Sequence, residues 1–253
     1  MTVCESSCMQ KRHQDRNIYF REQAGTTETF VIPFIEAVRP LDSTVSVLEI
    51  GCGEGGNLLP FLERGCRRAA GVDLAEKKIE NGRRFLSRAA PGANAELVCA
   101  DMYDSPDIGT FDLIISRDVI EHIPQQERFL TMLKKYLNTN GIIFFAFPPW
   151  LMPFGGHQQM CISRVLSGLP WIHLLPAPVY RYLLNMFGEP DRKVRGLLDI
   201  RETGITVERF EKICASSGYN ILRKELYLIN PNYKTKFNLT PRKHLPLLRD
   251  IPW

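Results

Sequence analysis

The chain has 253 residues, of which 44% are hydrophobic and 24% charged, and its formal net charge is +4 at pH 7. This length and composition favour one soluble domain with a large buried core, and they argue against a disordered or fibrous protein. The small net charge, and the lack of a basic helix with interleaved aromatic residues, argue against nucleic acid as a partner.

The N-terminal sequence MTVCESSCMQ lacks the apolar run of a signal peptide, and no stretch reaches the roughly 20 apolar residues that cross a bilayer. Seven scattered cysteines fit a reducing compartment, so we expect a cytoplasmic protein in which Cys66, Cys99 and Cys214 are buried. Cys4 and Cys8 form C-x-x-x-C without a third cysteine. We therefore expect no iron–sulfur cluster and no other bound metal.

The most informative segment is 45–56, VSVLEIGCGEGG, in which a β-branched apolar run breaks into a loop with glycine at every second position. Such glycines allow sharp turns and a close approach of the backbone to a ligand. The loop also satisfies G-x-G-x-x-G, so by itself it fits either a dinucleotide or a nucleoside cofactor. The loop residues that we expect to bind the cofactor are Glu49, Gly51, Cys52, Gly53 and Gly55.

Two aspartates downstream distinguish these cofactors. The predicted strand 68–73, RAAGVD, ends in Asp73, which is placed to accept hydrogen bonds from both ribose hydroxyls. A third predicted strand, AELVCA, is followed by Asp101, which a dinucleotide site does not require. An adenine amine suits Asp101, and the apolar residues after the two aspartates, Leu74 and Met102, are expected to cover the faces of the ring.

The order E-x-G-x-G-x-G, GVD and AD, followed by FDLIISRDVIEHI at 111–123, resembles the class I S-adenosylmethionine-dependent methyltransferase family over about residues 18–230. Within that family the chain is similar to the branch that methylates quinone precursors and other small molecules. The segment 147–176 resembles a smaller group associated with cell-surface glycan or lipid-linked assembly. One departure is Ala75, where many members have a Ser or Thr that caps the next helix.

The resemblance implies an α/β fold, namely a Rossmann-like, doubly wound, mostly parallel sheet of seven strands. It also implies S-adenosylmethionine as cofactor and S-adenosylhomocysteine as product. Glu49 would receive the cofactor's amino group, the backbone at Gly51 its carboxylate, and the carbonyl near Ser116 would assist. An N-terminal segment containing Tyr19 would close over the methionine end, with ordinary packing of this segment as the alternative.

Periodicity and turn residues predict the remaining elements of one methyltransferase domain over 1–253. Its expected parts are an N-terminal cap (1–40), the cofactor-binding core (41–147), an inserted lid (148–205) and the end of the sheet with a basic tail (206–253). The predicted helices are 30–38, 54–65, 76–89, 124–138 and 207–217, and the further predicted strands are 141–147, 221–229 and 233–239.

The lid is expected over the carboxyl ends of the strands, where such sheets bind ligands. Residues 148–188 include six tryptophan, tyrosine and phenylalanine side chains and two arginines but no acidic residue, which favours an apolar or anionic acceptor such as a lipid- or glycan-linked small molecule. Packing of the aromatic side chains onto the sheet is the alternative. Residues 233–253 carry five basic residues and one acidic residue and end in an apolar run. They predict peripheral contact with an anionic membrane, with a solvated tail as the alternative.

Methyl transfer is an in-line displacement, and a hydroxyl acceptor usually needs a base that takes its proton. His157, which follows two glycines, is our first candidate for this base, and His122 in the E-H-I turn is the second. His173 is expected to pack, and Asp118 would orient a histidine or bind the acceptor. The alternatives to an oxygen methyltransferase are a cofactor-binding interaction protein without transferase activity and a nicotinamide-dependent oxidoreductase.

Overall fold

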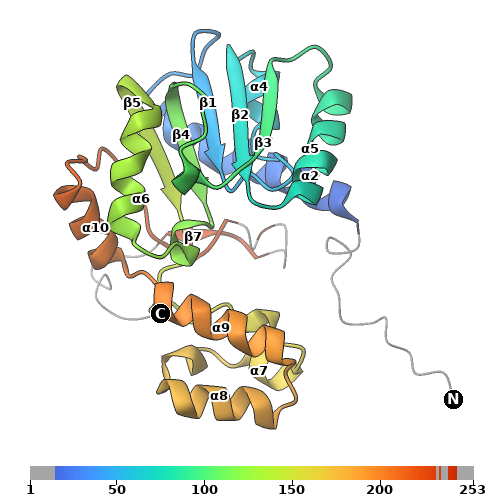
Figure 1. Ribbon diagram of the computed structural model, residues 1–253, viewed down its shortest axis with the longest axis vertical. Coiled ribbons are helices and arrows are strands. Elements are labelled where there is room, and N and C mark those ends of the chain that lie inside the picture. Colours follow the sequence, from blue (N-terminus) through green and yellow to red (C-terminus); the bar gives the residue numbers. More distant parts are fainter. Residues whose placement is uncertain (1–14, 232–233, 235–238, 244–253) are drawn as a thin grey trace, which may run out of the picture. The chain divides into compact units, whose positions relative to one another are not determined.

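The computed structural model describes residues 15–231, 234 and 239–243, and the chain divides into two compact units (Figure 1). The sheet unit contains the described residues among 1–117, 132–145 and 222–244, and the lid unit contains 118–131 and 146–221. The expected organisation as one domain with an inserted lid stays a prediction.

The sheet unit is built around a five-stranded sheet with the order β3-β2-β1-β4-β5. The pairs β1–β2, β1–β4 and β2–β3 are parallel, and all five residues of β1 are buried, as expected for a central strand covered on both faces. Ile50 is aligned with Val72 on one side and Ser116 on the other, so the carboxyl ends of these strands meet at one edge. The strands are β1 (Ser46–Ile50), β2 (Arg68–Asp73), β3 (Ala95–Cys99), β4 (Phe111–Arg117) and β5 (Leu137–Ala146).

The expected sheet of seven strands is wrong for the described residues. The predicted strand 221–229 is reduced to β6 (Tyr227–Ile229), which pairs antiparallel with β7 (Arg242–Lys243) in a separate two-stranded sheet. The predicted strand 233–239 lies largely outside the described residues. The α/β, Rossmann-like class with its parallel core is confirmed.

The helices of the sheet unit pack apolar side chains against the strands. The side chains of Phe20, Phe61 and Ile79 are at most 1% exposed and belong to one buried cluster with residues of β1 and β4. Cys66 is buried as expected, whereas Cys99 is exposed. The helical elements are α2 (Arg16–Thr26), the π-helix η1 (Thr27–Val31), α3 (Ile32–Glu36), α4 (Leu59–Glu63), α5 (Glu76–Ala89) and the 3₁₀ turns η2 (Met102–Asp104) and η4 (Lys134–Tyr136).

The lid unit is helical and has a small apolar core of its own. Tyr180 and Leu184 of α8 are fully buried with Leu166 and Leu197, and Cys214 is buried elsewhere in the unit as predicted. None of the described helices is long and apolar enough to cross a membrane. The helical elements are α7 (Arg164–Gly168), α8 (Ala177–Met186), α9 (Asp191–Thr203), α10 (Val207–Ser216) and the turns η3 (Ile120–His122), η5 (Gln158–Met160) and η6 (Ile172–Leu174). Helix α6 (Gln126–Leu133) begins in this unit.

Candidate active site

The glycine loop leaves β1 at the edge where the carboxyl ends of the parallel strands meet. The φ values of Gly51, Gly53 and Gly55 are 71°, 56° and 74°. This is a left-handed backbone conformation that residues with a Cβ rarely adopt. Gly56 is required for another reason, because a Cβ there would lie 2.5 Å from the carbonyl oxygen of Phe20 in α2. The Cys52 side chain is fully buried, and a Cβ at Gly71 would lie 2.7 Å from its sulfur. The Cys52 side chain therefore packs inside the sheet unit, and its backbone N–H donates to the Val72 carbonyl oxygen at 3.1 Å.

Glu49 is a buried carboxylate at the base of this loop. Its Oε1 accepts a hydrogen bond from Asn57 Nδ2, and Asn57 Oδ1 accepts one from Arg117 at 2.7 Å. Burial raises the pKa of Glu49 to about 8, and the bond from Asn57 and the charge of Arg117 offset part of that effect. Glu49 Oε2 and Ser116 Oγ are both buried and have no hydrogen-bond partner among the described residues.

The two aspartates lie at the carboxyl ends of β2 and β3. Asp73 Oδ2 accepts from the backbone N–H of Gly53 at 2.9 Å, and its Oδ1 accepts from Ala75 at 2.8 Å, so the carboxylate is fixed beside the glycine loop. Asp101 is exposed and caps the turn η2 by accepting from the N–H of Tyr103 at 2.9 Å. Leu74 is 71% exposed, whereas the side chain of Met102 is buried.

Helix α2 is fixed to the glycine loop by an ion pair that the sequence did not indicate. Arg16 donates to both carboxylate oxygens of Glu54, at 2.7 and 2.6 Å, and Glu54 is 1% exposed. The guanidinium of Arg16 also lies 4.7 Å from the centre of the Tyr19 ring. Tyr19 is therefore part of the segment next to the loop, and its expected contact with the cofactor stays a prediction.

The candidate catalytic residues come together in the lid unit. The rings of His122 and His157 are 5.1 Å apart in an edge-to-face arrangement, and Nε2 of each ring lies 3.8 Å from Glu121 Oε1. Glu121 is 1% exposed, while the side chains of His122 and His157 are 43% and 14% exposed. Glu121 belongs to the E-H-I motif but was not predicted as a site residue.

The charges around this cluster affect its titration. Burial and the nearby negative charge of Asp118 raise the pKa of Glu121. Desolvation lowers the pKa of His122, and the charge of Asp118 opposes that shift. Asp118 itself is exposed, has a φ of 55° and donates its backbone N–H to Ala146 at 2.8 Å.

The two glycines before His157 have a packing role. A Cβ at Gly155 would lie 2.5 Å from the carbonyl oxygens of Pro149 and Trp150, and a Cβ at Gly156 would lie 2.2 Å from His173 Cβ. The chain itself occupies the space that side chains at these positions would need, so the two glycines serve packing, and the role of His157 as a base stays a prediction. His173 is fully buried with a ring nitrogen 2.8 Å from the Trp150 carbonyl oxygen, which confirms its expected packing role.

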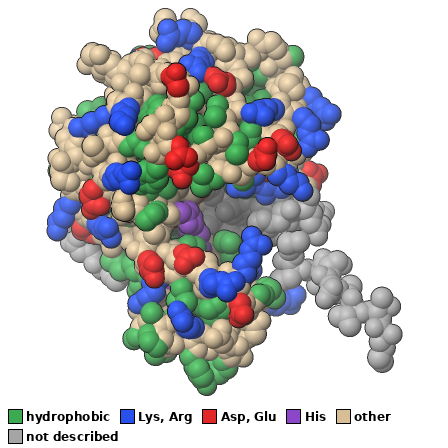
Figure 2. Space-filling model, in the orientation of Figure 1, with side chains coloured by type: hydrophobic (Ala, Val, Ile, Leu, Met, Phe, Trp, Pro, Cys, Tyr) green, Lys and Arg blue, Asp and Glu red, His purple; other side chains and the backbone are tan. Residues whose placement is uncertain are grey.

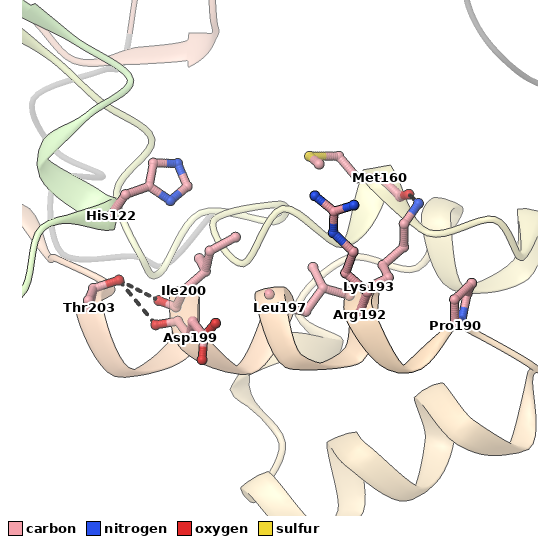
Figure 3. A pocket seen from close by; sticks show the side chains of 10 residues that line it. His122, Met160, Pro190, Arg192, Lys193, Leu197, Asp199, Ile200 and Thr203 are labelled. Carbon is pink, nitrogen blue, oxygen red and sulfur yellow. Dashed lines mark hydrogen bonds between the residues drawn. The ribbon is translucent and has the colours of Figure 1, made fainter. Parts of the chain in front are cut away.

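His122 also borders a pocket of about 610 Å³ that lies wholly within the lid unit. Figure 3 shows His122 at one end of this pocket and Met160, Arg192 and Lys193 at the other. Lys193 donates to the Met160 carbonyl oxygen. The remaining lining residues are Pro190, which precedes α9, and five residues of α9, namely Gly196, Leu197, Asp199, Ile200 and Thr203. The pocket thus offers an apolar wall with a histidine at one end and cationic side chains at the other.

The sequence of this chain matches a known family over residues 20–175, more than half of its length, and that family is described as a methyltransferase domain. The chain belongs to the S-adenosylmethionine-dependent methyltransferase family. The alternative of a nicotinamide-dependent oxidoreductase is therefore wrong.

Sequence relatives cover only part of the chain. It is 37% identical over 120 residues to an uncharacterized protein, RP028, of Rickettsia prowazekii. The matched segment covers 45% of this chain and 47% of that protein. It is 33% identical over 136 residues to the ubiquinone biosynthesis O-methyltransferase of Rhizobium leguminosarum bv. trifolii. That matched segment covers 53% of this chain and 52% of that enzyme. The chain thus spans about half the length of the curated relatives that it matches.

A solved structure supports the fold. The plantazolicin methyltransferase BpumL, in complex with a pentazolic desmethylPZN analog and SAH, aligns with a TM-score of 0.55 at 15% identity, covering 86% of this chain and 72% of BpumL. At this identity the likeness concerns the fold alone.

The residues of the sheet unit fit the family's cofactor. A buried carboxylate oxygen of Glu49 that lacks a hydrogen-bond donor among the described residues suits the ammonium group of S-adenosylmethionine. The left-handed glycines let the loop turn sharply at the end of β1, and Asp73 lies next to them. Asn57 and Arg117 were missed from the sequence because neither belongs to a glycine or aspartate motif.

Proposed function

We propose that this chain transfers the methyl group of S-adenosylmethionine to an oxygen atom of a small, apolar acceptor that carries an anionic group. The observation that carries the proposal is the buried Glu49 carboxylate oxygen beside the left-handed glycine loop, which has no hydrogen-bond partner among the described residues. A bound ammonium group would supply the hydrogen-bond donor that this oxygen lacks among the described residues.

The cofactor-binding roles follow from the positions of the side chains. Glu49 receives the amino group, and the backbone around Gly51 lies beside the carboxylate. The N–H groups of Gly51 and Cys52 donate to the Val72 carbonyl oxygen at 2.8 and 3.1 Å, so they hold the loop in position. Asp73, already oriented by Gly53 and Ala75, retains lone pairs for the ribose hydroxyls. The other residues proposed to contact the cofactor are Cys52 through its backbone, Gly55, Leu74, Asp101, Met102, Ser116 and Tyr19.

When bound, S-adenosylmethionine would supply its methyl group to an acceptor that attacks in line, with S-adenosylhomocysteine as the leaving group. The new bond joins the acceptor oxygen to the methyl carbon, the carbon–sulfur bond breaks, and the acceptor's proton is released. The lid-unit cluster is the proposed place for that proton, with His157 or His122 as the base and Asp118 as a nearby charge. The ubiquinone biosynthesis O-methyltransferases among the relatives support an oxygen acceptor.

The pocket beside His122 supports the choice of acceptor. Leu197, Ile200 and Met160 favour an apolar body, and Arg192 favours an anionic group at the end of the pocket away from His122. A prenylated ring or a lipid- or glycan-linked molecule combines both properties. The segment 148–188 has the same bias, since it carries two arginines and no acidic residue.

Peripheral binding to an anionic membrane is the final part of this proposal. Val179, Tyr182 and Met186 recur at helical spacing on α8 and are 45%, 66% and 56% exposed. Figure 2 shows hydrophobic side chains gathered over this part of the lid unit. An exposed apolar helix face of this kind suits insertion between lipid headgroups.

Asp73→Ala tests the cofactor site. Loss of a charged hydrogen-bond acceptor costs roughly 1.5 to 3 kcal/mol, so affinity for S-adenosylmethionine in calorimetric titration should fall by about 10- to 150-fold. Asp107→Ala, which removes an exposed aspartate elsewhere in the sheet unit, is the matched control. Methylated products are then identified by mass spectrometry after labelled cofactor is offered to lipid and glycan extracts. Unchanged affinity in Asp73→Ala contradicts the proposed site, and tight binding without any transfer favours an interaction protein.

A further inference from the structure

We propose that Glu121, His122 and His157 form a binding site for one divalent transition-metal ion of the Zn²⁺ type. One ligand atom from each residue can be chosen so that all three lie within 4.8 Å of one another. Ligands of a tetrahedral ion with bonds of 2.0 to 2.2 Å are separated by about 3.4 Å. The 3.8 Å distances from Glu121 Oε1 to both Nε2 atoms therefore need to shorten by only a few tenths of an ångström.

The buried carboxylate of Glu121 is a second observation that points to a cation site. Both carboxylate oxygens of Glu121 are buried, and neither has a hydrogen-bond partner among the described residues. An ionised carboxylate in such surroundings is costly unless it is paired or binds a metal. The two imidazoles supply the nitrogen ligands that distinguish a transition metal from Mg²⁺ or Ca²⁺, which prefer oxygen.

The backbone around the cluster is held by hydrogen bonds within the lid unit. Thr203 Oγ1 donates to the Glu121 carbonyl oxygen at 2.6 Å, and Gln126 Nε2 donates to the carbonyl oxygens of Ile120 and Thr203 at 3.0 and 2.7 Å. His157 is held in a left-handed conformation with a φ of 59°. These contacts fix the turn that carries two of the ligands, which reduces the reorganisation needed for binding.

Three protein ligands leave a coordination position open, and His122 borders the pocket. This part of the inference rests on the proposed function. An acceptor hydroxyl that takes the open position loses its proton to solvent more readily, because a bound divalent ion lowers the pKa of a coordinated hydroxyl as it does that of water. The resulting oxygen attacks the methyl carbon as the carbon–sulfur bond breaks. With the ion bound, the histidines would be its ligands, and the proton-accepting role proposed for them would apply to the metal-free protein.

The test measures metal binding apart from activity. Untagged protein is freed of metal with a chelator and titrated with Co²⁺ while its visible absorption is followed, and then with Zn²⁺ in competition with a chromophoric chelator. We expect one ion per chain and a visible band typical of Co²⁺ with nitrogen and oxygen ligands. Glu121→Gln and His157→Ala should each weaken binding by at least about 100-fold, since each removes a direct ligand. Glu127→Gln, which alters an exposed carboxylate on α6, should bind as the unchanged protein does.

Thermal unfolding of each variant shows whether it is folded. If His157→Ala does not fold, His122→Gln provides a second variant that removes a ligand. Failure of the unchanged protein to bind Co²⁺ or Zn²⁺, or equal binding by the ligand variants, overturns the metal site. Cofactor titration on the same samples separates the two proposals. Methyl transfer that persists at full rate in chelator contradicts a role for the metal in transfer and leaves the proposed methyltransferase activity intact. Co²⁺ binding without S-adenosylmethionine binding supports the metal site and contradicts the proposed methyltransferase activity.

Discussion

Glu49 illustrates how far a single residue could be predicted. Its place two residues before the first glycine indicated contact with the cofactor's amino group, and the structure places it, buried, beside the glycine loop. Its partner Asn57 could not be predicted, because the bond between them depends on how the loop turns between residues 51 and 58. The raised pKa of Glu49 likewise arises from burial, which a motif does not report.

We predict that cofactor binding makes Glu49 release its proton. With a pKa of about 8, the carboxyl is mostly protonated at pH 7 in the free protein, and a bound ammonium group favours the ionised form. Calorimetric titrations at pH 7 in buffers of different ionisation enthalpy should report release of up to about one proton per cofactor. The release should vanish in Glu49→Gln, and a binding enthalpy that does not vary with the buffer would contradict the prediction.

The same pKa predicts how stability depends on pH. In the unfolded chain Glu49 titrates near 4.5, below its folded value, so the unfolded chain loses the proton first as pH rises. Glu49 therefore favours the folded state below about pH 4.5, and this contribution is lost progressively up to about pH 8. Urea unfolding of the free protein should show a shallower loss of stability over this window in Glu49→Gln. An identical pH dependence in both proteins would count against a raised pKa.

The histidine cluster shows the limit of sequence reasoning at this scale. His122 and His157 were chosen separately, 35 residues apart, for their local motifs. Their contact across Glu121 comes from the tertiary structure of the lid unit, and for that reason the sequence indicated a proton acceptor and no metal. His157 was chosen partly for its glycines, which serve packing against Trp150 and His173.

At the scale of elements, strong periodicity was a reliable guide and loop chemistry was less so. Helix α5 has the predicted bounds 76–89, and β2 has the predicted bounds 68–73. The helix expected over 54–65 is shortened to α4 because the left-handed glycines extend the turns and Pro60 suits only the first helical turn. The strand expected over 221–229 is shortened to β6 and lies outside the main sheet, because local composition does not specify which partner a strand finds.

The ion pair between α2 and the glycine loop leads to a prediction about this element. Arg16→Ala leaves the Glu54 carboxylate, which is 1% exposed, without the donors that now satisfy both its oxygens. Because Arg16 is 32% exposed and water can enter, we expect a loss of about 1 to 3 kcal/mol in the free energy of unfolding. Cofactor affinity should weaken as well, since the loop loses its link to α2.

Urea denaturation followed by circular dichroism measures this loss. Arg21→Ala on the same helix is the matched control, because Arg21 is exposed and contacts only the Phe20 ring at 5.8 Å among its described interactions. Removal of both charges in Arg16→Ala with Glu54→Gln should recover part of the stability. Equal stability of the two arginine variants would show that the ion pair does not fix α2 to the loop.

At the scale of the whole molecule, each unit carries a feature suited to an anionic membrane, and the two can be tested separately. The lid unit has the exposed apolar face of α8, and the sheet unit has Lys234, Arg242 and Lys243 near its C-terminal end. The other basic residues of the predicted tail, Lys236 and Arg249, lie outside the described residues. Apolar insertion persists in salt, whereas attraction of basic residues to anionic lipid is screened.

We therefore predict two distinguishable losses in co-sedimentation with vesicles that contain anionic phospholipid. Lys234→Glu and Arg242→Glu should each weaken binding at low salt by about 5-fold or more, since a basic residue near the surface contributes about 1 kcal/mol, and the effect should shrink as salt is added. Tyr182→Asp should weaken binding at every salt concentration. Leu222→Asp, whose parent side chain is also 66% exposed, is the matched control. Equal losses of vesicle binding in Tyr182→Asp and Leu222→Asp would show that α8 is not part of the membrane-binding surface. Failure of the unchanged protein to bind vesicles at low salt would refute membrane binding and leave the proposed methyl transfer unaffected.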